Sequence, residues 1–195
     1  MTHTESSSRR SFLGMLPAGA LAVAALAPRA AASEVALRHA TVLFVRHAET
    51  DGPSSENPGL SEQGRARAAG LAGLLSGTPV TAVFATELKR TGETMEPVAE
   101  QAGLTVETYA AREPGGFVEQ LEELGAGEVI VVAGHSNTVP KMVELLGGSL
   151  EGLDQWGYLP ETEHDRVIVQ TLVAAEPGEP LRALQTLDLR LSPAE

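Results

Sequence analysis

Histidine and arginine side chains follow two apolar segments that lie far apart in the sequence. The segment TVLFV at 41–45 leads directly into Arg46 and His47, and the segment VIVVAG at 129–134 leads into His135. Ligands of α/β proteins gather at the carboxyl ends of the sheet strands. If both segments are parallel neighbouring strands, we expect the two imidazoles to meet at one edge of a sheet.

These groups suit the binding and transfer of a phosphoryl group. A third apolar segment, at 80–85, is followed by Arg90 at an expected helix start, and Ser136 and Asn137 lie where another helix begins. Guanidinium groups match phosphate oxygens in charge and geometry, and free amides at a helix start bind anions. A neutral imidazole can act as a nucleophile toward phosphorus. The sequence therefore predicts a phosphate-binding cage.

Apolar segments that alternate with amphipathic ones indicate the elements that would hold this cage. The expected strands are 41–45, 80–85, 105–109, 128–133, 166–173 and 184–189, and the expected helices are 62–75, 89–102, 117–124 and 139–146. Ser61 suits a helix N-cap, and Gly103 and Gly147–Gly148 suit helix ends. Composition marks 51–59 and 151–165 as surface loops. The pattern predicts a three-layer α/β/α sandwich with a mostly parallel central sheet.

Some chemically capable side chains lie outside this pattern. His39 and His164 follow no matching motif, and we expect them to face solvent. Trp156 and Tyr158 lie in the acidic loop, where packing of the loop is expected in preference to the wall of a substrate pocket. No set of His, Asp and Glu has the spacing of a metal site, so we expect no metal and no cofactor.

The N-terminal residues 1–32 have the order of parts found in a secretory signal peptide. Arg9–Arg10 precede an uncharged stretch at 11–28, and Ala30–Ala32 provide an A-x-A cleavage pattern. The arginine pair resembles a twin-arginine export signal. We expect the twin-arginine export machinery to deliver a domain of residues 33–195 to the periplasm or the medium. A stable membrane insertion is not expected after cleavage, because a span needs roughly 20 predominantly apolar residues.

Composition excludes several classes of function. The formal net charge is −12 at pH 7, which disfavours nucleic acid as a partner. The chain has no cysteine, which excludes a disulfide framework and a thiolate nucleophile. An anionic substrate therefore needs a local basic pocket, such as the predicted cage.

Four sequence motifs, in order, resemble the histidine phosphatase superfamily, the phosphoglycerate-mutase-like proteins, and particularly its small phosphohistidine-phosphatase-like branch. They are LFVRHAET at 43–50, LSEQGRARAAGLAGLL at 60–75, VFATELKRTGETMEPVAE at 83–100 and VVAGHSNTVPKMVELLGG at 131–148. EHDRVIVQTL at 163–172 fits the usual late strand of the family.

The resemblance implies a role for each matching residue. His47 would attack phosphorus and become phosphohistidine, while Arg46 and Arg90 hold the phosphoryl oxygens. A protonated His135 would stabilise the developing charge. Ser136 would contribute a further donor to the phosphate.

Other positions are less closely fixed by the resemblance. It places the proton-donating acid at Glu113, with Glu49 and Asp51 as rivals. Asn137 is expected either to contact phosphate or to cap its helix. Alanine stands at position 48 where the family usually has glycine, and its methyl group is expected to crowd the phosphate slightly.

The expected function is that of an exported phosphatase, a phosphoric monoester hydrolase. Its partner would be a phosphorylated small molecule or a phosphoprotein. A phosphomutase is the alternative within the superfamily, although the two predicted loops lack the basic cluster that a second phosphate would need. A non-catalytic module that binds a phosphorylated ligand is the alternative outside enzymes.

Overall fold

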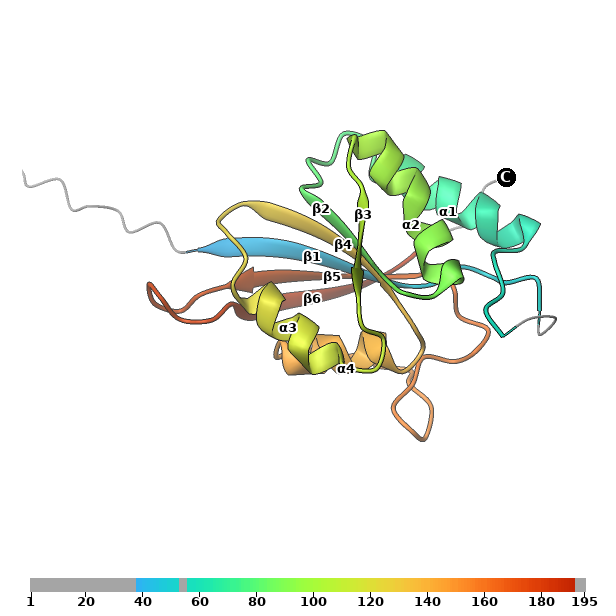
Figure 1. Ribbon diagram of the computed structural model, residues 1–195. Coiled ribbons are helices and arrows are strands. Elements are labelled where there is room, and N and C mark those ends of the chain that lie inside the picture. The colour runs from blue at the N-terminus through green and yellow to red at the C-terminus, as the bar shows by residue number, and fades with distance from the viewer. Residues whose placement is uncertain (1–37, 53–55, 192–195) are drawn as a thin grey trace, which may run out of the picture. The chain divides into compact units, whose positions relative to one another are not determined.

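The computed structural model describes residues 38–52 and 56–191 (Figure 1). The strands are β1 (His39–Arg46), β2 (Ala82–Thr86), β3 (Val106–Tyr109), β4 (Glu128–Gly134), β5 (Arg166–Val173) and β6 (Arg182–Arg190). The helices are α1 (Glu62–Leu74), α2 (Lys89–Ala102), α3 (Pro114–Glu122) and α4 (Thr138–Leu145). None of these helices is long and apolar enough to span a membrane. The expected signal peptide at 1–32 lies outside the described residues.

The strands form one sheet in the order β3-β2-β4-β1-β5-β6. β3, β2, β4 and β1 run parallel to one another, and β5 and β6 continue the sheet antiparallel. Helices α1 and α2 cover one face and α3 and α4 cover the other (Figure 1). The three-layer sandwich predicted from the sequence is confirmed.

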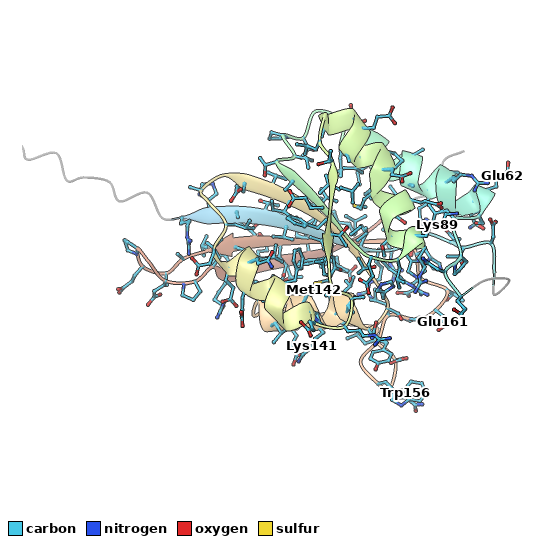
Figure 2. All side chains as sticks on the ribbon, viewed as in Figure 1. Glu62, Lys89, Lys141, Met142, Trp156 and Glu161 are labelled. Carbon is cyan, nitrogen blue, oxygen red and sulfur yellow. The ribbon has the colours of Figure 1, made fainter. Side chains whose placement is uncertain are left out.

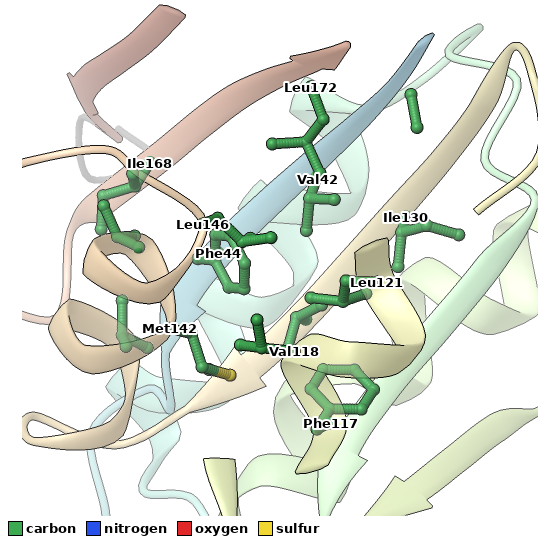
Figure 3. Packing of buried hydrophobic residues seen from close by; sticks show 14 of the residues in the cluster. Val42, Phe44, Phe117, Val118, Leu121, Ile130, Met142, Leu146, Ile168 and Leu172 are labelled. Carbon is green, nitrogen blue, oxygen red and sulfur yellow. The ribbon is translucent and has the colours of Figure 1, made fainter. Parts of the chain in front are cut away.

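Alternate side chains of the central strands fill two separate cores. Val42 and Phe44 of β1 pack with residues of α3 and α4, as Figure 3 shows. Leu43 and Val45 of the same strand pack with residues of α1 and α2. A strand that is buried on both faces needs apolar side chains at every position, which accounts for the unbroken apolar runs in β1 and β4.

The ends of the helices follow the expected local signals, with one exception. Ser61 caps α1, and its hydroxyl accepts a hydrogen bond of 3.0 Å from the Gly64 amide. Gly103 and Gly147 have positive φ angles of 69° and 93° after α2 and α4. Helix α3 starts at Pro114, three positions before the expected start, because proline fits the first turn of a helix.

The register of the sheet brings the chemically active segments together. Arg46 at the end of β1 pairs with Gly134 at the end of β4. The ladder continues one step further, since the His47 amide donates a hydrogen bond of 2.9 Å to the Gly134 carbonyl. His47 and His135 therefore leave neighbouring strands at the same edge, next to the end of β2.

Helix α1 approaches the segment after β1 so closely that position 64 requires glycine. A Cβ atom at Gly64 would lie 2.1 Å from the carbonyl oxygen of Glu49. We expect Gly64→Ala to lower the free energy of unfolding in urea by about 2 kcal/mol, because backbone must move to relieve the overlap. Gly70→Ala is the matched control in the same helix, since a Cβ there meets nothing within 4 Å. It is expected to stabilise by roughly 0.5–1 kcal/mol. Equal stability of the two variants would contradict this reason for the glycine.

Candidate active site

Two buried histidines and two arginines surround one point at the carboxyl edge of the sheet. The ring centroids of His47 and His135 are 5.5 Å apart, and the residues are only 8% and 9% exposed. The positive charges of Arg46 and Arg90 act on both imidazoles. The structure thus brings together four of the residues that the sequence selected.

Within residues 38–52 and 56–191, the hydrogen bonds of His47 leave one ring nitrogen free. Nδ1 lies 2.8 Å from the carbonyl oxygen of Ala48. Because a carbonyl only accepts, Nδ1 carries the proton and donates it. Nε2 of the neutral ring therefore keeps its lone pair, as a nucleophile requires.

His135 is oriented by two threonine hydroxyls. Thr91 Oγ1 donates its only proton to a backbone carbonyl, at 2.7 Å from Leu88 O, and lies 2.7 Å from Thr86 Oγ1. The Thr86 hydroxyl must then donate to Thr91 and accept from His135 Nε2, which lies 3.1 Å away. Nε2 therefore carries the proton of the neutral ring, and Nδ1 is the nitrogen left for a bound anion.

Burial and positive charge keep both imidazoles neutral. Desolvation, reinforced by Arg46 and Arg90, lowers the pKa of His47 to about 3. Desolvation and Arg90 lower the pKa of His135 to about 4. His135 is therefore neutral in the free protein, because the neighbouring arginines repel a proton. The expected protonation of His135 concerns the occupied site and stays a prediction. To donate a hydrogen bond through Nδ1 to a bound anion, the His135 ring must gain a proton, and the anion favours this by neutralising the charges of Arg46 and Arg90.

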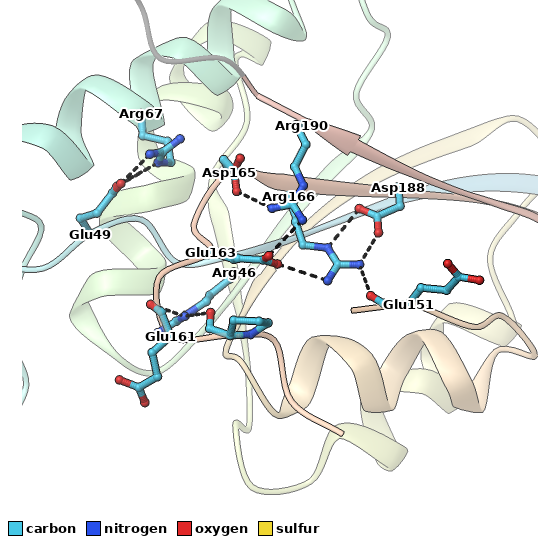
Figure 4. Close-up of polar contacts among 11 residues, drawn as sticks. Arg46, Glu49, Arg67, Glu151, Glu161, Glu163, Asp165, Arg166, Asp188 and Arg190 are labelled. Carbon is cyan, nitrogen blue, oxygen red and sulfur yellow. Dashed lines mark hydrogen bonds and ion pairs between the residues drawn. The ribbon is translucent and has the colours of Figure 1, made fainter. Parts of the chain in front are cut away.

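Arg46 is fixed by the backbone of the loop at 149–165. Its Nη1 donates to the carbonyl oxygens of Pro160 at 3.0 Å and Glu161 at 2.8 Å (Figure 4). Its buried Nε has no hydrogen-bond partner among the described residues. Leaving a buried hydrogen-bond donor without a partner costs free energy. An anion that accepts a hydrogen bond from the guanidinium group of Arg46 would remove this cost. The loop predicted to lie on the surface thus contacts the site.

His164 belongs to the site, and the expectation that it faces solvent is wrong. The residue is half-buried, and its ring centroid lies 5.5 Å from that of His47. Its Nδ1 donates to the carbonyl oxygen of His47 at 2.8 Å. His164 therefore positions the backbone of His47. Its place just before the late strand was the only sequence signal that could have selected it.

The carboxylates near the site have different surroundings. Glu49 accepts hydrogen bonds of 3.0 and 2.9 Å from Arg67 Nε (Figure 4). Partial burial alone would raise the pKa of Glu49, but the bonds from Arg67 bring it below its usual range. Glu49 is therefore an ion-pair partner that stays ionised, which disfavours it as a proton donor. Asp51 is exposed in the loop after β1.

Two further carboxylates, Glu87 after β2 and Glu113 before α3, are candidates for the proton donor. Glu113 is exposed at the N-cap position of α3 and makes no side-chain hydrogen bond within the described part of the chain. Glu87 accepts a 3.0 Å hydrogen bond from the Ala111 amide, and its charge acts on His135 by raising the pKa of that imidazole. Glu87 is the carboxylate that the sequence did not single out.

The remaining predicted residues have structural contacts. The Asn137 side chain does not cap α4; instead, Thr138 Oγ1 accepts a 2.9 Å hydrogen bond from the His135 amide. The Ser136 carbonyl accepts a 2.9 Å hydrogen bond from the Leu159 amide. The methyl group of Ala48 is buried in a cluster with Leu60 and Ala68, so its place is in the packing of α1.

The neutral imidazoles predict a loss of stability in acid. In the unfolded chain His47 and His135 take up protons near pH 6.5, whereas the folded pKa values are about 3 and about 4. Between these values the unfolded state binds more protons, so the free energy of unfolding falls as the pH falls below 6.5. The slope is up to about 1.4 kcal/mol per pH unit for each histidine.

Urea unfolding at several pH values between 7 and 4.5 measures this slope. The double variant His47→Asn/His135→Asn is expected to show a clearly smaller slope than the wild type. Leu184→Ala, at an exposed residue of β6 that does not titrate, is the control and keeps the wild-type slope. An unchanged slope in the double variant would contradict the assignment.

Comparison with known proteins shows which family part of this chain resembles. The model of the histidine phosphatase superfamily (branch 1) matches residues 42–113, which include Arg46, His47 and Arg90. The resemblance to the histidine phosphatase superfamily is confirmed. None of the curated proteins compared with the chain matches it in sequence.

Solved structures with the histidine phosphatase fold match most of this chain. Mycobacterial hydrolase 2 is 18% identical, with a TM-score of 0.59 over 81% of this chain and 93% of that one. A mycobacterial glucosyl-3-phosphoglycerate phosphatase is 15% identical, with a TM-score of 0.57 over 80% and 100%. The protein histidine phosphatase SixA, complexed with tungstate, is 15% identical, with a TM-score of 0.54 over 77% and 96%. At sequence identities of 15–18%, this structural likeness establishes the fold alone.

Proposed function

We propose that this histidine phosphatase-like chain hydrolyses a phosphomonoester or a related phosphoryl compound through a phosphohistidine intermediate on His47. The observation that carries the proposal is the state of His47: a neutral ring, fixed through Nδ1, with a free Nε2 beside two guanidinium groups. The superfamily match and the phosphatases among the similar structures support the reaction type.

The reaction takes place in two displacements at phosphorus. In the first, Nε2 of His47 forms a bond to phosphorus while the bond to the leaving oxygen breaks. Arg46, Arg90 and the Nδ1 side of His135 hold the phosphoryl oxygens, and the bound dianion supplies the negative charge that makes protonation of His135 favourable. In the second, water attacks phosphorus, inorganic phosphate leaves and His47 returns to its neutral form.

A carboxylic acid donates the proton to the leaving oxygen and later accepts one from water. The family resemblance assigns this role to Glu113. Glu87 is its rival, supported by its electrostatic contact with His135. The hydrogen bond from the Ala111 amide lowers the pKa of Glu87, which favours Glu113. Turnover of an alkyl phosphate, whose leaving group needs a proton, distinguishes the two in the variants Glu87→Gln and Glu113→Gln. The variant that lacks the true acid loses more activity than the other.

Export completes the proposal. The arginine pair and the alanine-rich cleavage pattern of residues 1–32 support delivery to the periplasm by the twin-arginine machinery. Replacement of Arg9 and Arg10 by Lys, followed by cell fractionation, tests it. Retention of the double variant inside the cell is the expected result, and unchanged export would contradict it.

Covalent trapping tests the intermediate directly. The chain is mixed with a ³²P-labelled phosphoryl donor and quenched, and the label is then exposed to acid and to base. Label that is labile in acid and stable in base, and that maps to His47, supports the enzyme. Product analysis separates the alternatives: free phosphate indicates a phosphatase, an isomerised substrate indicates a mutase, and ligand binding without label indicates a binding module.

A further inference from the structure

The loop at 149–165 presents two aromatic rings to solvent. Trp156 is 70% exposed and Tyr158 is 42% exposed, so the expected packing of these rings within the loop is wrong. Asp154 Oδ1 accepts hydrogen bonds from the amides of Trp156 at 2.8 Å and Tyr158 at 2.9 Å. Gly157 between them has a φ of 80°, which favours glycine. Figure 2 shows Trp156 at the tip of this turn.

The rings line cavities of the size that small molecules occupy. A groove of about 490 Å³ is walled by both rings and by residues of α4, among them Pro140 and Lys141. A second cavity of about 440 Å³ shares Lys141 and Tyr158 with the first and reaches Arg112. Binding sites for small molecules have volumes of roughly 300–1,000 Å³ and mostly apolar walls with a few polar groups.

The same loop connects these cavities to the phosphate cage. The Leu159 amide, one residue after Tyr158, donates a 2.9 Å hydrogen bond to the Ser136 carbonyl. The next two carbonyls hold Arg46. Asn137, two residues after His135, lines both cavities. Arg46, His47, Arg90 and His135 line neither cavity, so Asn137 and the backbone of this loop are the link between the groove and the cage.

The charges of the groove favour ring contact over ion pairing. Lys141 Nζ lies 3.0 Å from a carboxylate oxygen of Glu144, which also lines the larger cavity. Its positive charge is thus compensated before any ligand arrives. What the groove offers in excess is aromatic surface, and aromatic rings attract other rings through stacked or edge-to-face contacts.

We propose that Trp156 and Tyr158 form a subsite that binds a planar aromatic ring in the leaving group of the substrate. This inference rests on the proposed phosphatase function and names its substrate class: phosphomonoesters of ring-bearing alcohols. The aromatic contacts act on the leaving group, while the cage acts on the phosphoryl group.

Benzyl phosphate and cyclohexylmethyl phosphate test the subsite as a matched pair. Both are esters of primary alcohols of similar size, so their leaving groups differ mainly in planarity. We expect a kcat/KM ratio of roughly threefold to tenfold in favour of benzyl phosphate, the size of one or two aromatic contacts. Trp156→Ala and Tyr158→Leu are each expected to bring the ratio toward one. Leu184→Ala, at an equally exposed apolar residue of β6, keeps the wild-type ratio.

Fluorescence provides a second measurement that needs no turnover. Trp156 is the only tryptophan of the chain, so its emission reports on the subsite alone. Saturation with the non-hydrolysable benzylphosphonate is expected to change the emission, and cyclohexylmethylphosphonate is expected to change it less.

The two proposals fail in different ways. Turnover of both esters with a ratio of one, and with no effect of Trp156→Ala, overturns the subsite and leaves the phosphatase. Absence of turnover with every phosphate ester overturns the phosphatase, and the fluorescence titration then decides the subsite by itself. Equal emission changes with the two phosphonates overturn the ring preference.

Discussion

His47→Ala is expected to lower the turnover of 4-nitrophenyl phosphate by roughly 10³-fold or more, as removal of a nucleophile does in other enzymes with covalent intermediates. Methyl replaces the ring whose Nε2 would bond to phosphorus, and alanine provides no substitute. The variant is also expected to retain no acid-labile label. Steady-state kinetics and the trapping experiment measure the two effects on the same preparation.

The matched control for this variant is His39→Ala. His39 lies at the other end of β1 and is exposed, so its replacement is expected to leave turnover unchanged. Circular dichroism shows whether His47→Ala keeps the fold. A folded His47→Ala variant with wild-type turnover would contradict the assignment of the nucleophile.

Arg166→Met is expected to have the largest effect on stability. Arg166 is only 2% exposed, and its guanidinium group contacts Asp188, Glu163 and the Glu151 carbonyl (Figure 4). Methionine leaves Asp188 and the Glu151 carbonyl without this donor, while Glu163 keeps its hydrogen bond from Arg190. Removing one partner from a fully buried ion pair costs about 3–5 kcal/mol. Because Asp188 and Glu163 are 33% and 24% exposed and Glu163 keeps its pair with Arg190, we expect a loss of about 2–3 kcal/mol in the free energy of unfolding in urea.

An exposed ion pair on the next strand provides the comparison. Arg182 pairs with Glu122 at 2.5 Å, but its side chain is half exposed. Arg182→Met is expected to cost less than about 1 kcal/mol, because solvent screens such a pair. Similar losses in Arg166→Met and Arg182→Met would show that the cluster around Arg166 contributes no more than a surface contact.

Local sequence patterns predicted most of the elements. Strand β5 and helix α2 have the bounds expected from the sequence, 166–173 and 89–102. Both have local signals: apolar β-branched residues in β5, and Gly103 at the end of α2. The start of α3 was missed because Pro114–Gly116 has the composition of a loop.

The cage was predictable because its side chains directly follow strand ends. The contacts that complete it were not, since they depend on the three-dimensional arrangement. His164 bonds to a backbone carbonyl, and no residue type marks a partner of that kind. The pKa of His135 depends on burial and on Arg90, which is 45 positions away in the sequence. A family pattern that names a protonated histidine describes the occupied site, whereas the structure describes the free one.

The loop at 149–165 contacts the cage with its main chain. The groups that bind Arg46 and Ser136 are the carbonyls of Pro160 and Glu161 and the amide of Leu159. Every residue has a carbonyl, and every residue except proline has an amide. Mutation can therefore exchange exposed side chains of this loop, including those of the proposed subsite, without removing any group that holds the arginine in place. Selectivity and phosphate chemistry can evolve separately in such an arrangement.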